Sequence, residues 1–197
     1  MTRPLVLLES TAMGLLTFSM NVTLDGCCDH RAGVPDDDML DWFTRLLEAA
    51  DGIIYGRTTY EMMEEAFRPL ARDEKAPRAV GAWARTIDAK PKFVVSSTRR
   101  EFAWNNTTRL EGDLATAVKE LKEKAPRGLL VGSHKLAASL DRLGLVDEYR
   151  FVIHPVLAGH GPTLFQGQPT PNVLDLVANE RLPGGQIITH YRRKPRE

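Results

Sequence analysis

The chain has 197 residues, of which 43% are hydrophobic and 26% are charged, and this predicts one globular domain with a sizeable core. Lys and Arg number 26 and Asp and Glu number 26, so the chain lacks the basic surplus of a general nucleic-acid binder. No apolar run approaches the roughly 20 residues of a membrane helix, so neither a nucleic-acid nor a membrane partner is expected.

The first predicted elements follow a short N-terminal extension. Residues 1–14 are too weakly apolar for a signal peptide and are interpreted as this extension, with residues 15–197 forming a single domain. Residues 15–24 are rich in apolar and β-branched side chains and predict a strand. After a turn-rich loop, residues 36–38 are three aspartates that offer N-caps for a helix with one apolar face.

The middle of the chain alternates between strand and helix patterns. Residues 52–55 predict a buried strand, and residues 58–67 predict a helix in which Thr58 and Glu61 fit a capping box. Residues 68–90 lack a clear period and are interpreted as a loop with one helical turn near residues 80–85. The remaining predicted elements are strands at 92–97 and 107–112, a helix at 113–124, a strand at 128–133, a helix at 135–144, a strand at 148–157, and a final pair at 172–182 and 185–194.

Repeated strand–helix units followed by a run of strands predict an α/β fold with a mainly parallel sheet flanked by helices. Ligands of such sheets bind beyond the carboxyl ends of the strands. Residues 56–59 (GRTT), 96–100 (SSTRR) and 132–135 (GSHK) follow three predicted strands with arginines, hydroxyls and helix starts suited to phosphate. Each stretch alone also fits an ordinary capped or polar turn, but together they indicate a dinucleotide site.

Other chemistries are poorly represented in the sequence. The chain has no G-x-G-x-x-G dinucleotide fingerprint, Walker A sequence or G-x-S-x-G nucleophile elbow. Cys27, Cys28, Asp29 and His30 match no standard zinc spacing, so no metal is expected. The adjacent cysteines are poorly placed for a disulfide, which favours a reducing, cytoplasmic compartment. His154 and His190 lie on strand patterns and are interpreted as structural.

Five segments in a fixed order carry a family resemblance. They are MNVTLDG (20–26), DGIIYGRTTYE (51–61), FVVSST (93–98), LLVGSHKLAASL (129–140) and HPVLAGHGPTLF (154–165). The chain resembles the dihydrofolate reductase-like superfamily, and within it the branch with the C-terminal reductase domain of the bifunctional riboflavin biosynthesis protein and its stand-alone relatives. The resemblance covers about residues 15–192 and implies a mostly parallel sheet with a C-terminal antiparallel strand, a homodimer, and NADPH as cofactor.

The resemblance also implies roles for individual residues. The cofactor-binding residues would be Gly56, Arg57, Thr58, Thr59, Ser96, Ser97, Thr98, Arg99, Gly132, Ser133, His134, Lys135 and Leu136. Gly26, together with Asp25, would lie in a loop that closes over nicotinamide and substrate, while Gly159, Gly161, Thr163 and Phe165 would line the other side of the cleft.

The sequence departs from the family at two points. Ser133 stands where members commonly have a second glycine, which puts a side chain at the tightest approach of the cofactor. Folate reduction uses an acid three residues before a Trp-Phe pair. That position is Met39 here, and the acids near Trp42-Phe43 are Asp38 and Asp41. The deaminase domain of the bifunctional protein, with its zinc motif, is also missing from the sequence.

These residues predict an NADPH-dependent reductase of a small heterocyclic (pteridine- or pyrimidine-like) or carbonyl substrate. The reaction needs hydride from the nicotinamide and a proton for the atom that gains charge. Asp25, Asp38 and Asp41 are the candidate acids, a bound water is another, and capping or turn formation is the alternative role of the three aspartates. A ribosylamino-pyrimidine reductase of the riboflavin pathway and a non-catalytic NADPH-binding protein are the alternative functions.

Overall fold

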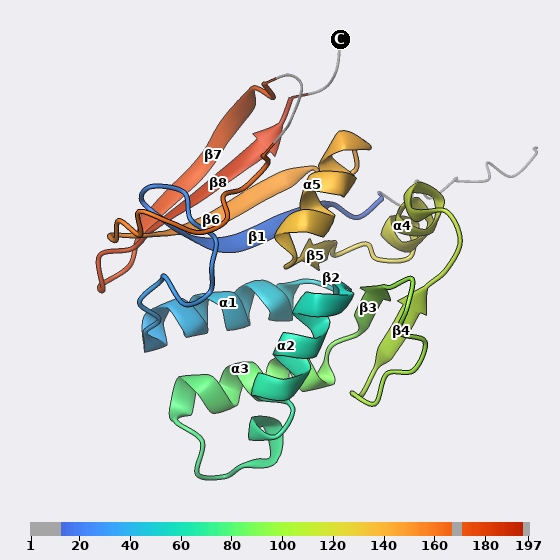
Figure 1. Cartoon of the computed structure of the whole chain (residues 1–197), viewed down its shortest axis with the longest axis horizontal. Helices are drawn as coiled ribbons and strands as arrows, with labels where there is room; N and C mark the ends of the chain where they lie inside the picture. The colour runs from blue at the N-terminus through green and yellow to red at the C-terminus, as the bar shows by residue number, and fades with distance from the viewer. Residues whose placement is uncertain (1–12, 167–170, 195–197) are drawn as a thin grey trace, which may run out of the picture.

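A mixed sheet of eight strands runs through the centre of the computed structural model, which describes residues 13–166 and 171–194 (Figure 1). The strand order is β4-β3-β2-β5-β1-β6-β8-β7. Neighbours among the first six strands are parallel, β8 is antiparallel to β6, and β7 is antiparallel to β8. The strands are β1 (Leu16–Thr23), β2 (Gly52–Gly56), β3 (Lys92–Val95), β4 (Thr107–Leu110), β5 (Leu129–Val131), β6 (Glu148–His154), β7 (Leu174–Arg181) and β8 (Ile187–Arg193).

This sheet confirms the predicted α/β fold and its antiparallel C-terminal strand. Every predicted strand is present, and the two closing segments form the β7–β8 hairpin. The extension predicted at residues 1–14 lies almost wholly outside the described residues.

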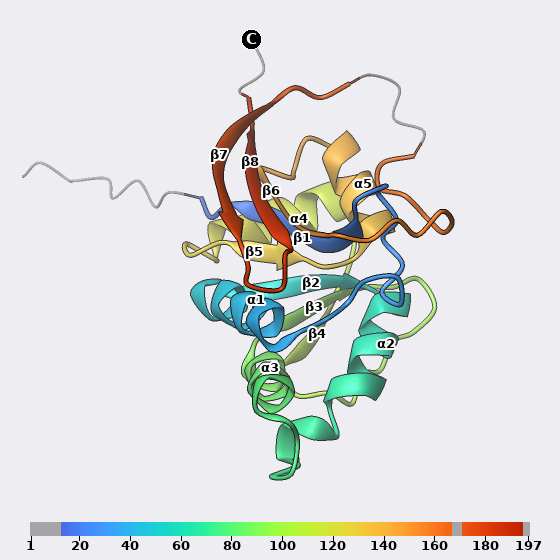
Figure 2. The ribbon, with the colours of Figure 1, turned by 90° about the vertical axis from the view of Figure 1, so that its left-hand side faces the viewer.

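Helices cover both faces of the sheet (Figure 2). Leu47, Tyr60 and Ile87 come from three helices on one face and form a buried cluster against β2 and β3. Val118 and Leu140 come from two helices that pack in a second cluster with β1 and β5 on the other face. The first three helices are α1 (Asp37–Ala49), α2 (Arg57–Phe67) and α3 (Arg78–Ala89), and the other two are α4 (Leu114–Glu123) and α5 (His134–Arg142).

Helix α3 corrects the predicted loop at residues 68–90. A short 3₁₀ helix, η1 (Leu70–Arg72), precedes it, and α3 itself is twelve residues long. The buried face of α3 consists of Ala79, Gly81, Trp83, Ala84 and Ile87, so the segment is as amphipathic as α1 and the loop interpretation overlooked this period. The ammonium of Lys92 caps the C-terminal end of the helix, where it donates to the carbonyls of Ile87, Asp88 and Lys90 at 2.7, 3.0 and 2.9 Å.

Polar contacts fix the edge of the sheet at which the parallel strands begin. Asp141, at the end of α5, is 2% exposed and accepts hydrogen bonds from the Tyr149 hydroxyl and the Arg193 guanidinium. Arg193 also donates to the Tyr149 oxygen at 2.6 Å, and Asn172 donates to Asp141 at 3.0 Å. This network joins α5 to β6, to β8 and to the segment before β7.

His154, at the end of β6, has the structural role that its strand position predicts. The ring is 1% exposed, its Nδ1 accepts from the Val34 amide at 3.3 Å, and its Nε2 lies 3.4 Å from the Asn21 side-chain oxygen. Burial lowers the pKa of His154 below its ordinary value. These contacts fit a neutral ring that connects β1, β6 and the loop before α1.

Acidification should therefore destabilise the fold through His154. Because the pKa is lower in the folded than in the unfolded state, the unfolded chain takes up the proton first. The stability that the neutral His154 ring contributes to the fold is fully present above the unfolded-state pKa of about 6.5. It is lost as the pH falls below that value. Thermal unfolding from pH 7.5 to 5.5 should show a smaller decline for His154→Gln than for the wild type, and parallel declines would contradict this role.

Candidate cofactor and substrate site

The order of the strands in the sheet brings the three phosphate-suited stretches together. After β1 the chain builds β2, β3 and β4 outward, returns to place β5 between β2 and β1, and then crosses to β6 on the far side of β1. Open α/β sheets bind ligands at such a switch point. The three phosphate-suited stretches follow β3, β2 and β5, which are immediate neighbours, so their strand ends span only about 10 Å.

Helices α2 and α5 begin directly at two of these strand ends. Their N-cap residues are Gly56 and Ser133, and within the described residues neither makes a side-chain capping hydrogen bond. The capping box predicted for Thr58 and Glu61 is therefore wrong, since Thr58 lies inside the first turn of α2. In contrast, aspartates cap α1 and α4. The uncapped first-turn N–H groups of α2 and α5 are suited to bind an anion.

Ser133 joins these two helix starts. The residue is 4% exposed, and its Oγ accepts a hydrogen bond from the Gly56 amide at 3.0 Å. The hydroxyl that replaces the family's second glycine therefore turns toward β2. The preceding residue is more restricted, because a Cβ on Gly132 would lie 3.1 Å from the ring of Tyr55. Glycine at position 132 is thus explained by its packing against Tyr55, and the close approach of a cofactor to this loop stays a prediction.

The two arginines at the other strand ends are paired with carboxylates. Arg57 Nη1 lies 2.9 Å from Glu61, and Arg99 lies 2.9 Å from Glu64 and 3.6 Å from Glu61. The Arg99 guanidinium also lies 5.2 Å from the centre of the Tyr60 ring. The sequence interpretation did not include Glu61 and Glu64 in the site, although their spacing of three places them on one face of α2.

Ser96 organises the turn that follows β3. It is 9% exposed, and its Oγ accepts hydrogen bonds from the backbone amides of Arg99 and Thr98 at 2.9 and 3.3 Å. Ser97 and Thr98 are exposed at the tip of this turn. The turn therefore presents hydroxyl groups to solvent beside a guanidinium that is already in an ion pair.

The loops after β1 and β6 form one wall, which corrects the prediction that they face each other across a cleft. Cys27 and Thr163 make an antiparallel bridge, and the Cys28 amide donates to the Pro162 carbonyl at 2.8 Å. Glycine is required at position 161, where φ is +98° and a Cβ would lie 2.6 Å from the Cys27 sulfur. The predicted substrate residues Gly26, Gly159, Gly161 and Thr163 all lie on this paired wall.

Phe165 and Thr163 are less available to a substrate than predicted. The Phe165 ring packs edge-on against Phe18 and Tyr149, at centroid distances of 5.6 and 6.0 Å. Thr163 Oγ1 accepts from the Gln166 side chain at 2.7 Å. Phe165 therefore anchors the loop to the core.

Asp25 connects the two loops of this wall. Its carboxylate accepts a hydrogen bond from the Thr23 hydroxyl and from the backbone amides of Gly159 and Ala158, at 2.7 and 3.1 Å. These three donors, the Thr23 hydroxyl first, lower the pKa of Asp25 to about 2. The carboxyl group is therefore ionised at neutral pH and in this geometry is an acceptor, so the structure does not favour it as the proton donor.

The two other candidate acids lie on the outer side of α1. Asp41 pairs with Arg78 at 2.9 Å, which lowers the pKa of Asp41, and Asp38 is exposed. Met39 is 3% exposed and packs with Val152 of β6, so it faces the sheet. Residues two positions apart on an α-helix point about 200° away from each other, so Asp41 faces away from the side of α1 on which Met39 lies. Within the described residues, Asp41 is thus held by Arg78, and Asp38 is exposed to solvent.

Asn21 is a polar residue near Met39 that the sequence interpretation did not assign to the site. It pairs in register with Val152 on β6, which places both side chains on the face covered by α1. Its side-chain oxygen lies 3.4 Å from His154 Nε2, and the residue is partly exposed. The position of Asn21, a polar residue within the otherwise largely apolar β1, could have indicated this role from the sequence.

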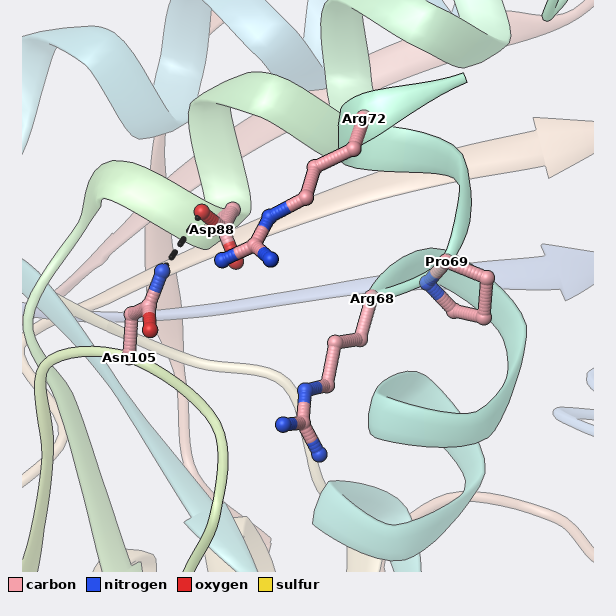
Figure 3. A pocket seen from close by; sticks show the side chains of 5 residues that line it. All are labelled: Arg68, Pro69, Arg72, Asp88 and Asn105. Atoms are coloured by element: carbon pink, nitrogen blue, oxygen red, sulfur yellow. Dashed lines mark hydrogen bonds between the residues drawn. The ribbon is translucent and has the colours of Figure 1, made fainter.

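Two hollows lie at the opposite edge of the sheet. A pocket of about 310 Å³ is lined by Arg68, Pro69, Arg72, Asp88 and Asn105, with both arginines pointing into it (Figure 3). Asn105 lies just before β4, at the edge where the parallel strands begin. A second hollow of about 540 Å³ includes Leu15 at the start of β1. Neither belongs to the candidate site.

The described residues 13–166 and 171–194 contain no group of three His, Cys, Asp or Glu side chains arranged to hold a metal ion. In the same part of the chain, no helix combines the length and apolar character needed to cross a membrane.

Comparison with known proteins identifies the family. The model of the RibD C-terminal domain matches residues 15–188. The chain belongs to the RibD C-terminal domain family. This confirms the branch that the sequence motifs indicated, and membership supports a reductase-like role. The uncharacterized protein YyaP of Bacillus subtilis (strain 168) is 29% identical over 182 residues, which make up 89% of this chain and 94% of YyaP.

Solved structures share the dihydrofolate reductase-like fold of this RibD-type domain. A putative riboflavin biosynthesis protein from Shewanella sp. PV-4 has 23% identity and a TM-score of 0.69, with 92% of this chain and 99% of that chain covered. The Thermotoga maritima diaminohydroxyphosphoribosylaminopyrimidine deaminase/5-amino-6-(5-phosphoribosylamino)uracil reductase has 15% identity and a TM-score of 0.65, covering 92% and 57%. A pyrimidine reductase-like protein from Corynebacterium diphtheriae has 13% identity and a TM-score of 0.58, covering 94% of each.

Proposed function

We propose that the protein is an NADPH-dependent reductase of a small heterocyclic (pteridine- or pyrimidine-like) or carbonyl substrate. The observation that carries this proposal is the meeting of three phosphate-suited stretches on neighbouring strands, with uncapped helix starts at two of them. The residues fit a dinucleotide, because α2 and α5 offer first-turn N–H groups without a side-chain cap.

In this proposal different residues of the protein bind the cofactor, hold the loops and orient the substrate. The starts of α2 and α5, with Lys135, bind the diphosphate, while Arg57 and Ser96 to Arg99 lie by the adenosine ribose and its 2′-phosphate. NADPH, when bound, supplies the hydride. Asp25 holds the loops after β1 and β6 together, and its ionised carboxylate is suited to accept a hydrogen bond from a substrate N–H or from water. We assign proton delivery to a bound water rather than to Asp38 or Asp41.

A direct binding experiment tests the cofactor assignment. Titration with NADPH should quench intrinsic fluorescence or raise the melting temperature with micromolar affinity, because any ligand that binds only the folded state stabilises it. Absence of binding at high micromolar NADPH would reject the proposal. Oxidation of NADPH can then be followed across a panel of pterins, pyrimidines, imines and carbonyl compounds.

The first alternative is the riboflavin-pathway reduction of a ribosylamino-pyrimidine. It is favoured by the match to the RibD C-terminal domain and by the likeness to the Thermotoga maritima protein whose name includes such a reductase. Rescue of a strain that lacks this reductase would support it. The absence of rescue, together with turnover of another substrate, would reject it.

The second alternative is a protein that binds NADPH without turning it over. It is favoured by Met39 at the position of the folate-reductase acid and by the low pKa of Asp25. Tight NADPH binding without oxidation across the substrate panel would support this function.

We also propose that the chain forms a homodimer. The edge strand β7 and the residue before it expose Val173, Leu176 and Val177, with 69, 55 and 45% of each residue accessible. An edge strand with exposed apolar side chains is a candidate pairing surface. Light scattering after size exclusion should give about twice the 22.0 kDa mass of one chain.

A further inference from the structure

Glu61 occupies the space between two arginines at the proposed phosphate end of the site. Its Oε2 lies 2.9 Å from Arg57 Nη1, and its Oε1 lies 3.6 Å from Arg99 Nη1. Arg57 follows β2 and Arg99 follows β3, which are adjacent strands. One carboxylate therefore bridges the two guanidinium groups that a ribose phosphate would contact.

Glu64 interacts with Arg99 in a different way. Its side chain is 14% exposed and lies 2.9 Å from Arg99 Nη2, whereas the Glu61 side chain is 36% exposed. The Tyr60 hydroxyl donates to Glu64 at 3.2 Å, and Arg99 Nε donates to the Glu101 carbonyl at 2.9 Å. These contacts hold Arg99 in place independently of Glu61. Glu61 adds negative charge to an arginine that is already paired.

The charges of the four residues nearest the two strand ends sum to zero, and Arg68, 3.6 Å from Glu64, adds a third positive charge beside them. Arg57 and Arg99 carry two positive charges, and Glu61 and Glu64 carry two negative charges. A ribose 2′-phosphate, with a charge near −2, must displace or repel Glu61 to reach both guanidinium groups. An unphosphorylated ribose meets no such repulsion, and carboxylates in dinucleotide sites commonly accept its 2′-hydroxyl.

We propose that Glu61 sets the cofactor preference as an internal anion that competes with the 2′-phosphate. Glu61 reduces the difference in binding affinity between NADPH and NADH that Ser96 and Arg99 would otherwise produce. This inference rests on the proposed dinucleotide site. It assigns a specificity role to a residue that hydride transfer itself does not require.

The variant Glu61→Gln tests the inference, with Glu65→Gln as the matched control. Glu65 is exposed on the same helix, so its replacement removes the same charge. At low salt, Glu61→Gln should lower the Kd for NADPH roughly 5- to 10-fold and change the Kd for NADH less than about 2-fold. Glu61→Lys should widen the difference further. With 2′,5′-ADP and 5′-AMP as probes, the same pattern should appear without the nicotinamide.

Each outcome separates the inference from the proposed function. A wild type that binds neither dinucleotide rejects the proposed function and the inference with it. Wild-type NADPH binding with an equal effect of Glu65→Gln, or with equal tightening of NADH, overturns the role of Glu61 alone. Melting temperatures of the unliganded variants within a few degrees of the wild type show that the fold is retained.

Discussion

Replacing Asp141 with alanine should lower the free energy of unfolding by about 3–5 kcal/mol, as is typical when one partner of a buried ion pair is removed. Asp141 is 2% exposed, and the Arg193 side chain with which it pairs is 14% exposed. The change would leave a buried guanidinium without its carboxylate and would remove the acceptor for the Tyr149 hydroxyl. Urea denaturation followed by circular dichroism measures the loss.

Two further variants separate charge from hydrogen bonding in this network. Tyr149→Phe removes one hydroxyl but leaves the Asp141–Arg193 pair, so it should cost only about 1 kcal/mol. Asp141→Asn keeps the shape and an acceptor but removes the charge, and its cost should lie between the other two. An Asp141→Ala loss no larger than that of Tyr149→Phe would show that the ion pair contributes little.

Replacing Arg57 with alanine should raise the Kd for NADPH about 10-fold or more and leave the melting temperature of the unliganded protein nearly unchanged. A charge-assisted hydrogen bond to phosphate contributes roughly 1.5–3 kcal/mol. In the unliganded protein Arg57 makes an exposed pair with Glu61 one helical turn away, and such pairs contribute roughly 0.3–0.5 kcal/mol. Isothermal titration and thermal unfolding of the same samples compare the two effects.

The control for Arg57 is Arg68→Ala at the other end of α2. Arg68 lies 3.6 Å from Glu64 and lines the pocket at the opposite edge of the sheet (Figure 3). It should leave NADPH affinity within about 2-fold, because Arg68 is exposed and reaches the site only indirectly, through Glu64. Similar losses of affinity in both variants, or a loss of stability without a loss of affinity in Arg57→Ala, would assign Arg57 a purely structural role.

Much of the fold could be predicted because its strands and most helices carry their own local signals. The aspartates at 36 and 113 cap α1 and α4 as expected, and Gly144, with φ of +71°, follows α5. Helix α3 was missed although it is amphipathic, because Trp83 and Ile87 on its buried face are interspersed with alanine and glycine. Its stability comes from packing against α1 and from the Lys92 ammonium, which only the assembled sheet brings to its end.

The candidate site was predictable as a set of strand ends but not as a set of contacts. Hydroxyls and arginines after apolar segments indicated which loops would meet, and the strand order brings them together. The pairing of Arg99 with Glu64 joins residues 35 positions apart, and the two backbone amides that donate to Asp25 lie more than 130 positions away. Sequence alone could not show that these charged groups are already engaged.

The late insertion of β5 has a consequence for how the chain folds. β1 pairs with β5 and β6, so Leu16 meets Leu129 and Thr17 meets Glu148. Both edges of β1 therefore lack their partners until more than one hundred further residues have been synthesised, and pairing over such separations is slow. During that interval an apolar strand with open edges is available to other chains. We expect folding yield in the cell to depend on holdase chaperones and on expression temperature more strongly than the stability of the finished domain would suggest.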